Sequence, residues 1–134
     1  MVKFHELKIG DYVQVNSNGQ SWQGEVIDFN HDEKEIGVYN GVQKFFFKGE
    51  DLDPVPVNDE SLLKMNFTRH PNEDGTVKYM KGAFRMQIPK AGDFSHFEIW
   101  YRDEKRHILH PIPMHELQNH YHAMTKVHLS AEAI

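Results

Sequence analysis

The last fifth of the chain has the spacing of one amphipathic helix. Between residues 113 and 129, apolar side chains recur every three or four positions. The stripe comprises Met114, Leu117, Tyr121, Met124 and either Val127 or His128. Such a repeat places its members on one face of an α-helix, which must be buried against another element. We therefore predict that this helix closes a core.

Four polar side chains of the same helix fall outside that stripe: His115, Gln118, Asn119 and His122. Gln118 and Asn119 are unusual on a purely solvated helix face, where Glu and Lys are the common helix formers. Two interpretations stay open for these amides. They satisfy backbone groups of the neighbouring sheet or barrel, or they contact a polar ligand.

Residues 7–57 have the pattern of a small barrel of short strands. Short apolar or alternating runs occur at 7–15, 22–29, 36–39, 45–47 and 54–57. Turn-forming residues separate the runs, and Asn40-Gly41 predicts a type I′ hairpin, which needs positive φ at both central positions. Gly24 marks a bulge or a close approach of two backbones. Four or five strands with these turns indicate an SH3-like barrel.

Residues 58–112 predict a short helix followed by a meander. Asn58 or Asp59 caps a helix that runs to Phe67 and turns Leu62, Leu63 and Met65 inward. Strands are expected at 77–88, 96–102 and 106–112, and Pro113 suits the first turn of the last helix. The expected fold is α+β, with a barrel lobe (1–57) and a helix–three-stranded antiparallel meander–helix lobe (58–134) in one cooperative unit.

Composition excludes several classes of function. The formal net charge of −5 argues against non-specific nucleic-acid binding, which needs a surplus of Lys and Arg. The chain has no cysteine, so disulfides and thiolate chemistry are absent. No apolar run approaches the roughly 20 residues that span a bilayer. We expect a soluble, cytoplasmic protein without a membrane partner.

Seven of the ten histidines lie between residues 96 and 128. His107, His110 and His115 offer three imidazoles for a metal ion. However, His115-Glu116 and His120 are one residue too far apart for the helical zinc motif, and strand positions 107 and 110 face opposite sides. We therefore expect neither a metal nor a cofactor, and no motif for nucleophilic catalysis is present.

Arginine and tryptophan gather in the predicted meander. Arg85, Trp100 and Arg102 project from one face of the expected strands, and Arg106 and His107 follow the tight turn. Indole planes stack on bases and guanidinium groups pair with phosphate oxygens, so this set predicts a site for an anionic, nucleotide-like ligand. The alternative is an ordinary exposed sheet face with Arg stems packed on Trp100.

Three motifs resemble a family of uncharacterised small proteins from Bacteroidetes genomes and their phages or prophages. They are Leu7–Val13, similar to L-x-I-G-N-x-V, the segment Pro54–Val57 with Leu62–Phe67, and His115–Tyr121, similar to H-x-L-Q-N-x-Y. His120 and His122 replace apolar residues of that family, and Lys126-Val127 replaces its Gly-Glu. The resemblance implies a mobile-element protein of the bacterial host cytoplasm and implies no reaction.

These observations predict a non-enzymatic binding protein that sequesters an anionic, nucleotide-like signal to antagonise host defence. The ligand is expected between the second sheet and the last helix, in contact with Arg85, Trp100, Arg102, Arg106, His107, His115, Gln118 and Asn119. One alternative is a protein–protein interaction module that presents aromatic residues of 45–47 to a host protein. The other is a His-dependent phosphodiesterase or metal hydrolase. A homo-oligomer is compatible with each.

Overall fold

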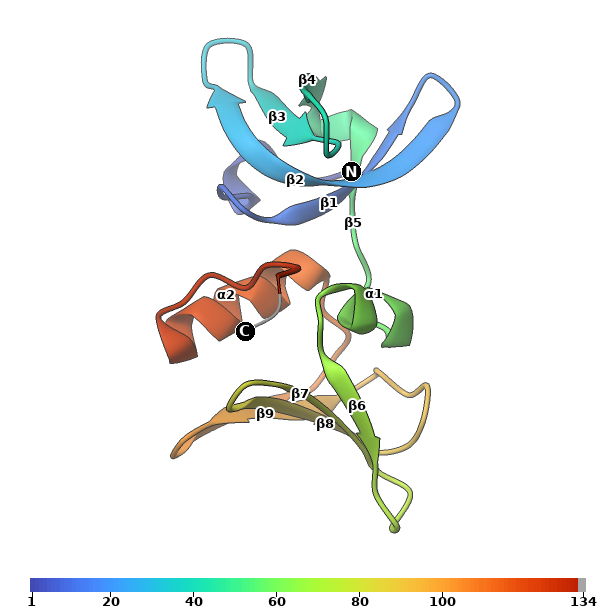
Figure 1. The fold of residues 1–134 in the computed structure, drawn as a ribbon. Helices are drawn as coiled ribbons and strands as arrows, with labels where there is room; N and C mark the ends of the chain where they lie inside the picture. Colours follow the sequence, from blue (N-terminus) through green and yellow to red (C-terminus); the bar gives the residue numbers. More distant parts are fainter. Residues whose placement is uncertain (133–134) are drawn as a thin grey trace. The chain divides into compact units, whose positions relative to one another are not determined.

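The computed structural model describes residues 1–132, which divide into two compact units (Figure 1). Unit 1 comprises Met1–Val55 together with Pro113–His115. Unit 2 comprises Pro56–Ile112 and the chain from Glu116 onward. The division falls two residues before the expected boundary, and a short segment from late in the sequence belongs to the first unit.

Unit 1 is built on one antiparallel sheet of five strands in the order β4-β3-β2-β1-β5. The strands are β1 (Tyr12–Ser17), β2 (Gln20–Asn30), β3 (Glu35–Tyr39), β4 (Lys44–Lys48) and β5 (Leu52–Pro54), with 3₁₀ turns at Phe4–Glu6 and Gly49–Asp51. Alternate residues of the strands, such as Val13, Val15 and Val38, are fully buried. Period-2 burial is what a sheet with one face toward a core requires.

The type I′ turn of unit 1 joins β1 to β2 rather than β3 to β4. Asn18 and Gly19 both have positive φ between the paired residues Ser17 and Gln20, which is the type I′ geometry. The prediction of that turn at Asn40-Gly41 was wrong, because only Gly41 has positive φ and four residues join β3 to β4. There the Asn40 side chain accepts hydrogen bonds from two backbone N–H groups instead.

Unit 2 contains a second antiparallel sheet, of order β10-β9-β8-β7-β6. Its strands are β6 (Thr68–Pro71), β7 (Val77–Lys81), β8 (Phe84–Ile88), β9 (Phe97–Tyr101) and β10 (Glu104–Ile108). The expected three-stranded meander was therefore wrong. The run 77–88 is a hairpin turning at Gly82, which has positive φ, and β6 was not foreseen. Over residues 1–132 the fold is α+β, mostly β, with two sheets and two α-helices.

The helices of unit 2 cover one face of its sheet (Figure 1). Helix α1 (Asp59–Lys64) is capped by Asn58, and α2 (Met114–Thr125) ends before Lys126, which has positive φ. The inward stripe Met114, Leu117, Tyr121 and Met124 is confirmed, since all four are buried. Val127 and His128 lie beyond the helix and are exposed, and Leu63 is 46% exposed rather than inward.

Candidate functional site

The face of the second sheet that points away from α2 carries two rows of polar side chains across neighbouring strands. Strand register sets Lys78 beside Gln87, Gln87 beside Glu98, and Glu98 beside His107. The next row places Arg85 beside Trp100 and Trp100 beside Lys105. We call this surface the outer sheet face, defined as Lys78, Arg85, Gln87, Glu98, Trp100, Lys105 and His107.

Trp100 is the centre of the outer sheet face. The guanidinium carbon of Arg85 lies 4.9 Å from the indole centroid, and the ammonium nitrogen of Lys78 lies 5.9 Å from it. Both distances are within cation–π range. The Nε of Arg85 is buried and, within the described residues, has no hydrogen-bond acceptor. An unpaired buried donor costs about 1–3 kcal/mol, so an acceptor oxygen here would be stabilising.

A small pocket lies at one end of the sheet, beside the row of Gln87, Glu98 and His107, and Trp100 is in the next row. Its volume is about 210 Å³, and its polar lining consists of Gln87, His96, Glu98 and His107. Glu98 pairs with Lys105 at 3.0 Å and faces the imidazole Nδ1 of His107 at 3.3 Å. These partners compensate the single carboxylate of the surface. The pocket is smaller than the roughly 300 Å³ of typical ligand sites, so it suits one part of a ligand.

Arg106 and Arg102 do not join the outer sheet face. Arg106 alternates with His107 along β10 and points to the helix side, where it pairs with Glu104 at 2.7 Å and donates 2.8 Å to Nδ1 of His120. A guanidinium can only donate, so this imidazole is neutral with its proton on Nε2. Burial, and then the charge of Arg106, lower the pKa of His120. Arg102 adopts positive φ in the β9–β10 turn and lies over Tyr101.

The expected position of the ligand, between the second sheet and the last helix, needs correction. Core side chains fill that space, since the rings of Phe84 and Tyr121 are 4.8 Å apart and both residues are buried. Interiors packed at this density leave no room for a nucleotide. The outer sheet face is therefore where the structure gathers three of the predicted residues, Arg85, Trp100 and His107.

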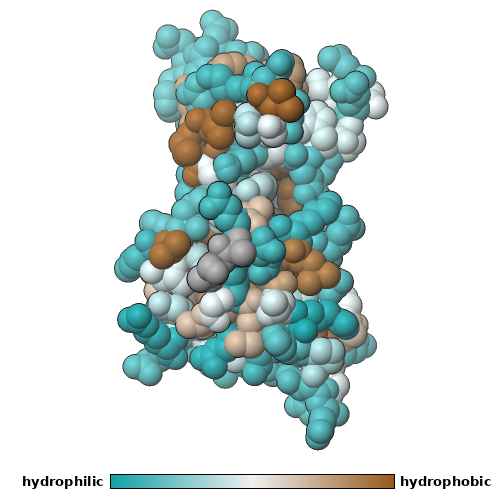
Figure 2. Space-filling view, viewed as in Figure 1, coloured by the Kyte–Doolittle hydropathy of each residue, from teal (hydrophilic) through white to brown (hydrophobic). Residues whose placement is uncertain are grey.

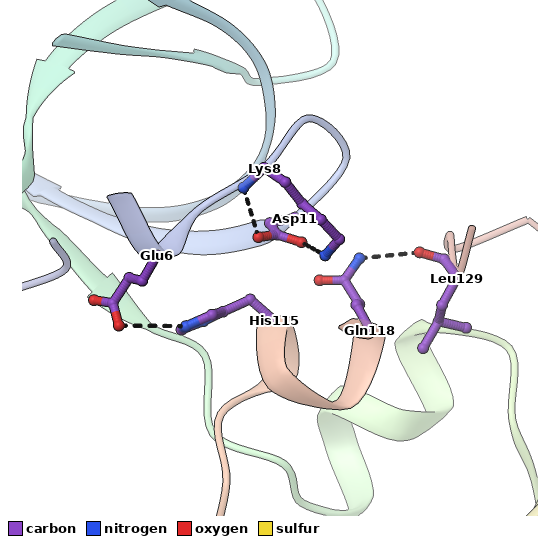
Figure 3. A network of polar contacts seen from close by, with 6 residues as sticks. All are labelled: Glu6, Lys8, Asp11, His115, Gln118 and Leu129. Atoms are coloured by element: carbon purple, nitrogen blue, oxygen red, sulfur yellow. Dashed lines mark hydrogen bonds and ion pairs between the residues drawn. The ribbon is translucent and has the colours of Figure 1, made fainter. Parts of the chain in front are cut away.

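Gln118 satisfies a backbone group, but that group belongs to the segment after α2 and not to a sheet or barrel, as the sequence had suggested. Its side chain is fully buried, and its amide donates to the backbone oxygen of Leu129 at 2.9 Å (Figure 3). Lys81 and Asn66 donate to the next two carbonyls, those of Ser130 and Ala131. Three side chains thus fix the segment that follows α2. Burial also lowers the pKa of Lys81. Asn119 is exposed.

His115 lies in unit 1 and is buried, although the helix pattern placed it off the apolar stripe. Its Nε2 is 4.0 Å from the carboxylate of Glu6, as Figure 3 shows. In the same unit, buried Asp11 accepts hydrogen bonds from both the backbone and the side chain of Lys8. The Nδ1 of His115 is buried without a hydrogen-bond partner among the described residues. This histidine is part of the interior of unit 1.

Unit 1 has a concavity of its own, which we call the aromatic pocket. It has a volume of about 460 Å³ and lies between the β1–β2 and β3–β4 turns. Its lining consists of Trp22, Phe45 and Phe47 together with Ser17, Asn18, Gln20, Gln23 and Asn40. Figure 2 shows brown hydrophobic side chains on this unit, in the upper half of the view, surrounded by polar residues. The sequence pointed to residues 45–47 but not to the amides around them.

Charge divides unevenly between the units. Unit 2 carries ten Lys and Arg against ten Asp and Glu, so its formal charge is zero. Unit 1 carries five basic and ten acidic residues, so the whole negative excess lies there. Unit 2 is neutral overall, but its outer sheet face carries three cationic side chains and one carboxylate. This face can therefore attract an anion, although the net charge of the whole chain is negative.

Residues 1–132 hold no group of three or more His, Asp or Glu side chains arranged to bind a metal ion. In that same part of the chain, no helix is long and apolar enough to cross a membrane. Comparisons with protein-family models, with curated proteins and with solved structures find no match to this chain. The candidate site therefore rests on its own geometry.

Sequence reasoning missed four members of the outer sheet face, Lys78, Gln87, Glu98 and Lys105, and also His96 of the adjoining pocket. Lys78, Gln87 and Glu98 lie in the alternating runs of the sheet, and alternation alone marks them as outward. Alternation does not predict the strand register, which places Lys78 of β7 near Trp100 of β9, two strands away. His96 lies just before β9 and reaches the pocket through the loop.

Proposed function

We propose that this protein is a non-enzymatic binding protein that holds an anionic, nucleotide-like ligand on the outer sheet face. The observation that carries the proposal is the indole of Trp100 with two cationic side chains, Lys78 and Arg85, within cation–π distance. A base stacks on an indole plane, and guanidinium and ammonium groups bind phosphate oxygens.

The adjoining pocket takes the part of the ligand that does not stack. With about 210 Å³ it has room for a ribose or one phosphate rather than a whole nucleotide. Glu98 accepts hydrogen bonds and suits hydroxyl or amine hydrogens, whereas Gln87 both donates and accepts. A ligand with a flat base, a sugar and a phosphate matches these three neighbouring environments.

The biological setting of this proposal is a mobile-element protein in the cytoplasm of a bacterial host. Sequestering a nucleotide signal needs tight binding without turnover, and no motif for a nucleophile is present in the sequence. Unit 1 is proposed to be an SH3-like barrel. The strand order β4-β3-β2-β1-β5 supports that assignment, and so does the eleven-residue length of the central strand β2.

Trp100 is one of two tryptophans, which gives a direct assay. In the Trp22→Phe variant, a nucleotide panel with cyclic mono- and dinucleotides and ADP-ribose should quench the remaining indole saturably. Calorimetry should show an affinity that weakens with salt, because phosphate contacts between charges are screened. Absence of any binding up to about 1 mM ligand, a free energy near −4 kcal/mol, would refute the proposal.

Two arginines of the same sheet provide a matched pair. Arg85→Ala should weaken binding by about 1.5–3 kcal/mol through loss of a charge-assisted hydrogen bond, and Trp100→Ala by about 1–3 kcal/mol through loss of stacking. Arg106→Ala removes an arginine from the opposite face and should leave affinity unchanged. Equal losses for Arg85 and Arg106 would mean that the ligand is elsewhere.

Binding and hydrolysis are separated by recovering the ligand. After hours with excess protein, heat denaturation should release the nucleotide chemically unchanged, as chromatography would show. Release of a cleaved product would identify a phosphodiesterase instead.

The second candidate, a protein–protein interaction module, is favoured by the exposed apolar side chains of unit 1: Ile9, Ile27, Val42 and Phe46. It predicts a protein partner and no nucleotide binding.

A further inference from the structure

The aromatic pocket of unit 1 is separate from the outer sheet face and has different chemistry. Its floor is formed by three rings. The centroid of Trp22 lies 6.4 Å from that of Phe45 and 5.8 Å from that of Phe47, and the two Phe rings are 6.5 Å apart. The rings are tilted or edge-on toward one another and therefore present more than one π face.

Trp22 is held in this position by the backbone beneath it. A Cβ on Gly24, two residues along β2, would lie 2.7 Å from the Trp22 ring and 2.6 Å from the backbone oxygen of Tyr39. Only glycine leaves space for the indole to lie across the strand there. The ring also packs against the buried core of unit 1, which restricts its motion and lowers the entropy cost of binding a ligand on it.

Five hydrogen-bonding side chains surround the rings, and none is charged: Ser17, Asn18, Gln20, Gln23 and Asn40. In the described residues, no hydrogen bond within the chain involves the side-chain amides of Asn18, Gln20 or Gln23. The side-chain oxygen of Asn40 accepts hydrogen bonds from the backbone N–H groups of Val42 and Gln43, so its side-chain NH₂ group is the part that can donate to a ligand. The rim therefore offers both donors and acceptors.

Charge excludes most ligand classes. The lining has no Lys, Arg or His, and unit 1 carries the entire negative excess of the chain, so phosphates, sulfates and carboxylates are repelled. A primary ammonium group would lose its hydration without gaining a carboxylate partner in the lining. A quaternary ammonium group suits the rings, but it cannot use five hydrogen-bonding side chains.

We propose that the aromatic pocket binds a neutral saccharide. The C–H face of a sugar ring carries partial positive charge and packs on the negative face of an indole. Its hydroxyl groups both donate and accept, as amide side chains do. The volume of about 460 Å³ lies within the roughly 300–1,000 Å³ of small-molecule sites. This inference goes beyond the proposed nucleotide site and does not depend on it.

The test uses the full-length Trp100→Phe variant, in which Trp22 is the only tryptophan. The protein is first screened on a glycan array of neutral glucose, mannose, galactose and N-acetylglucosamine oligomers. An oligosaccharide that binds is then titrated into the protein while the fluorescence of Trp22 is recorded. We expect a saturable change with Kd between about 1 μM and 1 mM. Salt between about 0.05 and 0.5 M should leave Kd unchanged, because no charged pair is screened.

Strand β4 offers a matched control. Phe45 and Phe46 are 38% and 40% exposed, but only Phe45 lines the pocket. Phe45→Ala and Gln23→Ala should each weaken saccharide binding by about tenfold or more, which is 1.4 kcal/mol, whereas Phe46→Ala should not. Circular dichroism melting verifies that each variant is folded before titration.

Three results would overturn the proposal. The first is that no neutral glycan on the array is retained. The second is that Phe45→Ala and Phe46→Ala weaken binding equally, which moves the site out of the pocket. The third is that trimethyllysine, an acidic glycan or an extended peptide quenches Trp22 while neutral sugars do not. Failure here leaves the Trp100 titration intact, since the two assays follow different indoles.

Discussion

Gln118 donates a hydrogen bond to the backbone oxygen of Leu129 at 2.9 Å, and both side chains are fully buried. Replacing Gln118 by Ala leaves that carbonyl without its donor, and we expect a loss of about 1–3 kcal/mol in the free energy of unfolding. Its neighbour Asn119 is exposed, so Asn119→Ala should cost less than about 0.5 kcal/mol. Urea denaturation measures both, and equal costs would contradict the assignment.

The phase of α2 is tested by a second pair. Leu117 is fully buried, so Leu117→Ala should lower the free energy of unfolding by about 2–5 kcal/mol through lost burial and a residual cavity. His122 is exposed on the same helix, and truncating it to Ala should cost under about 0.5 kcal/mol. If denaturant titrations reversed this order, the helix would be rotated from its assigned phase.

His120 should make stability depend on pH. Its pKa is lowered in the folded protein by burial and by Arg106, so the unfolded chain binds the extra proton more readily. Stability is therefore unaffected well above the ordinary histidine value of about 6.5 and falls as pH drops below it. His120→Gln removes this contribution and should flatten the profile between about pH 6.5 and 5. A variant profile parallel to the parent would contradict the lowered pKa.

Unfolding should be a single cooperative transition. The first two residues of α2 belong to unit 1 and the rest to unit 2, so melting either unit disrupts a shared helix. Trp22 reports on unit 1 and Trp100 on unit 2. Single-tryptophan variants, Trp100→Phe and Trp22→Phe, should give coincident denaturation curves after correction for each substitution's effect on stability. Two separate midpoints, each insensitive to Leu117→Ala, would show independent domains.

The sequence predicted elements whose signals are local. Strand β1 of unit 1 alternates, and the buried stripe of α2 follows from its three- and four-residue spacing. Strand β6 had no such signal, because all four of its residues are exposed and none is strongly apolar. Within the run 77–88, the buried positions are odd-numbered in β7 and even-numbered in β8, so the alternation shifts by one residue at the turn. Gly82 is the only glycine at that point, and one glycine between two alternating stretches is weak evidence for a turn.

The candidate site was predicted only in part, for reasons of register and long-range bonding. Arg106 and His107 are consecutive in one strand and cannot share a face, a rule that separates them without any structure. Gln118 is buried because the chain beyond the end of α2 folds back and brings the backbone oxygen of Leu129 to its side-chain amide. Helical periodicity contains no information about such a partner. The pairing of Arg85 with Trp100 depends on the length of the loop between β8 and β9.

The late segment of unit 1 has a consequence for how the protein is made. The N–H of Met114 donates to the carbonyl of Val55 at 2.7 Å, so the last piece of this unit is translated long after its strands. At about 5–20 residues per second, the ribosome leaves unit 1 without this segment for several seconds after its five strands have been made. The sheet ends in the edge strands β4 and β5, and before unit 1 is complete these edges can pair with other nascent chains. Slow translation or crowded polysomes should therefore favour aggregation of this protein at synthesis rather than after folding.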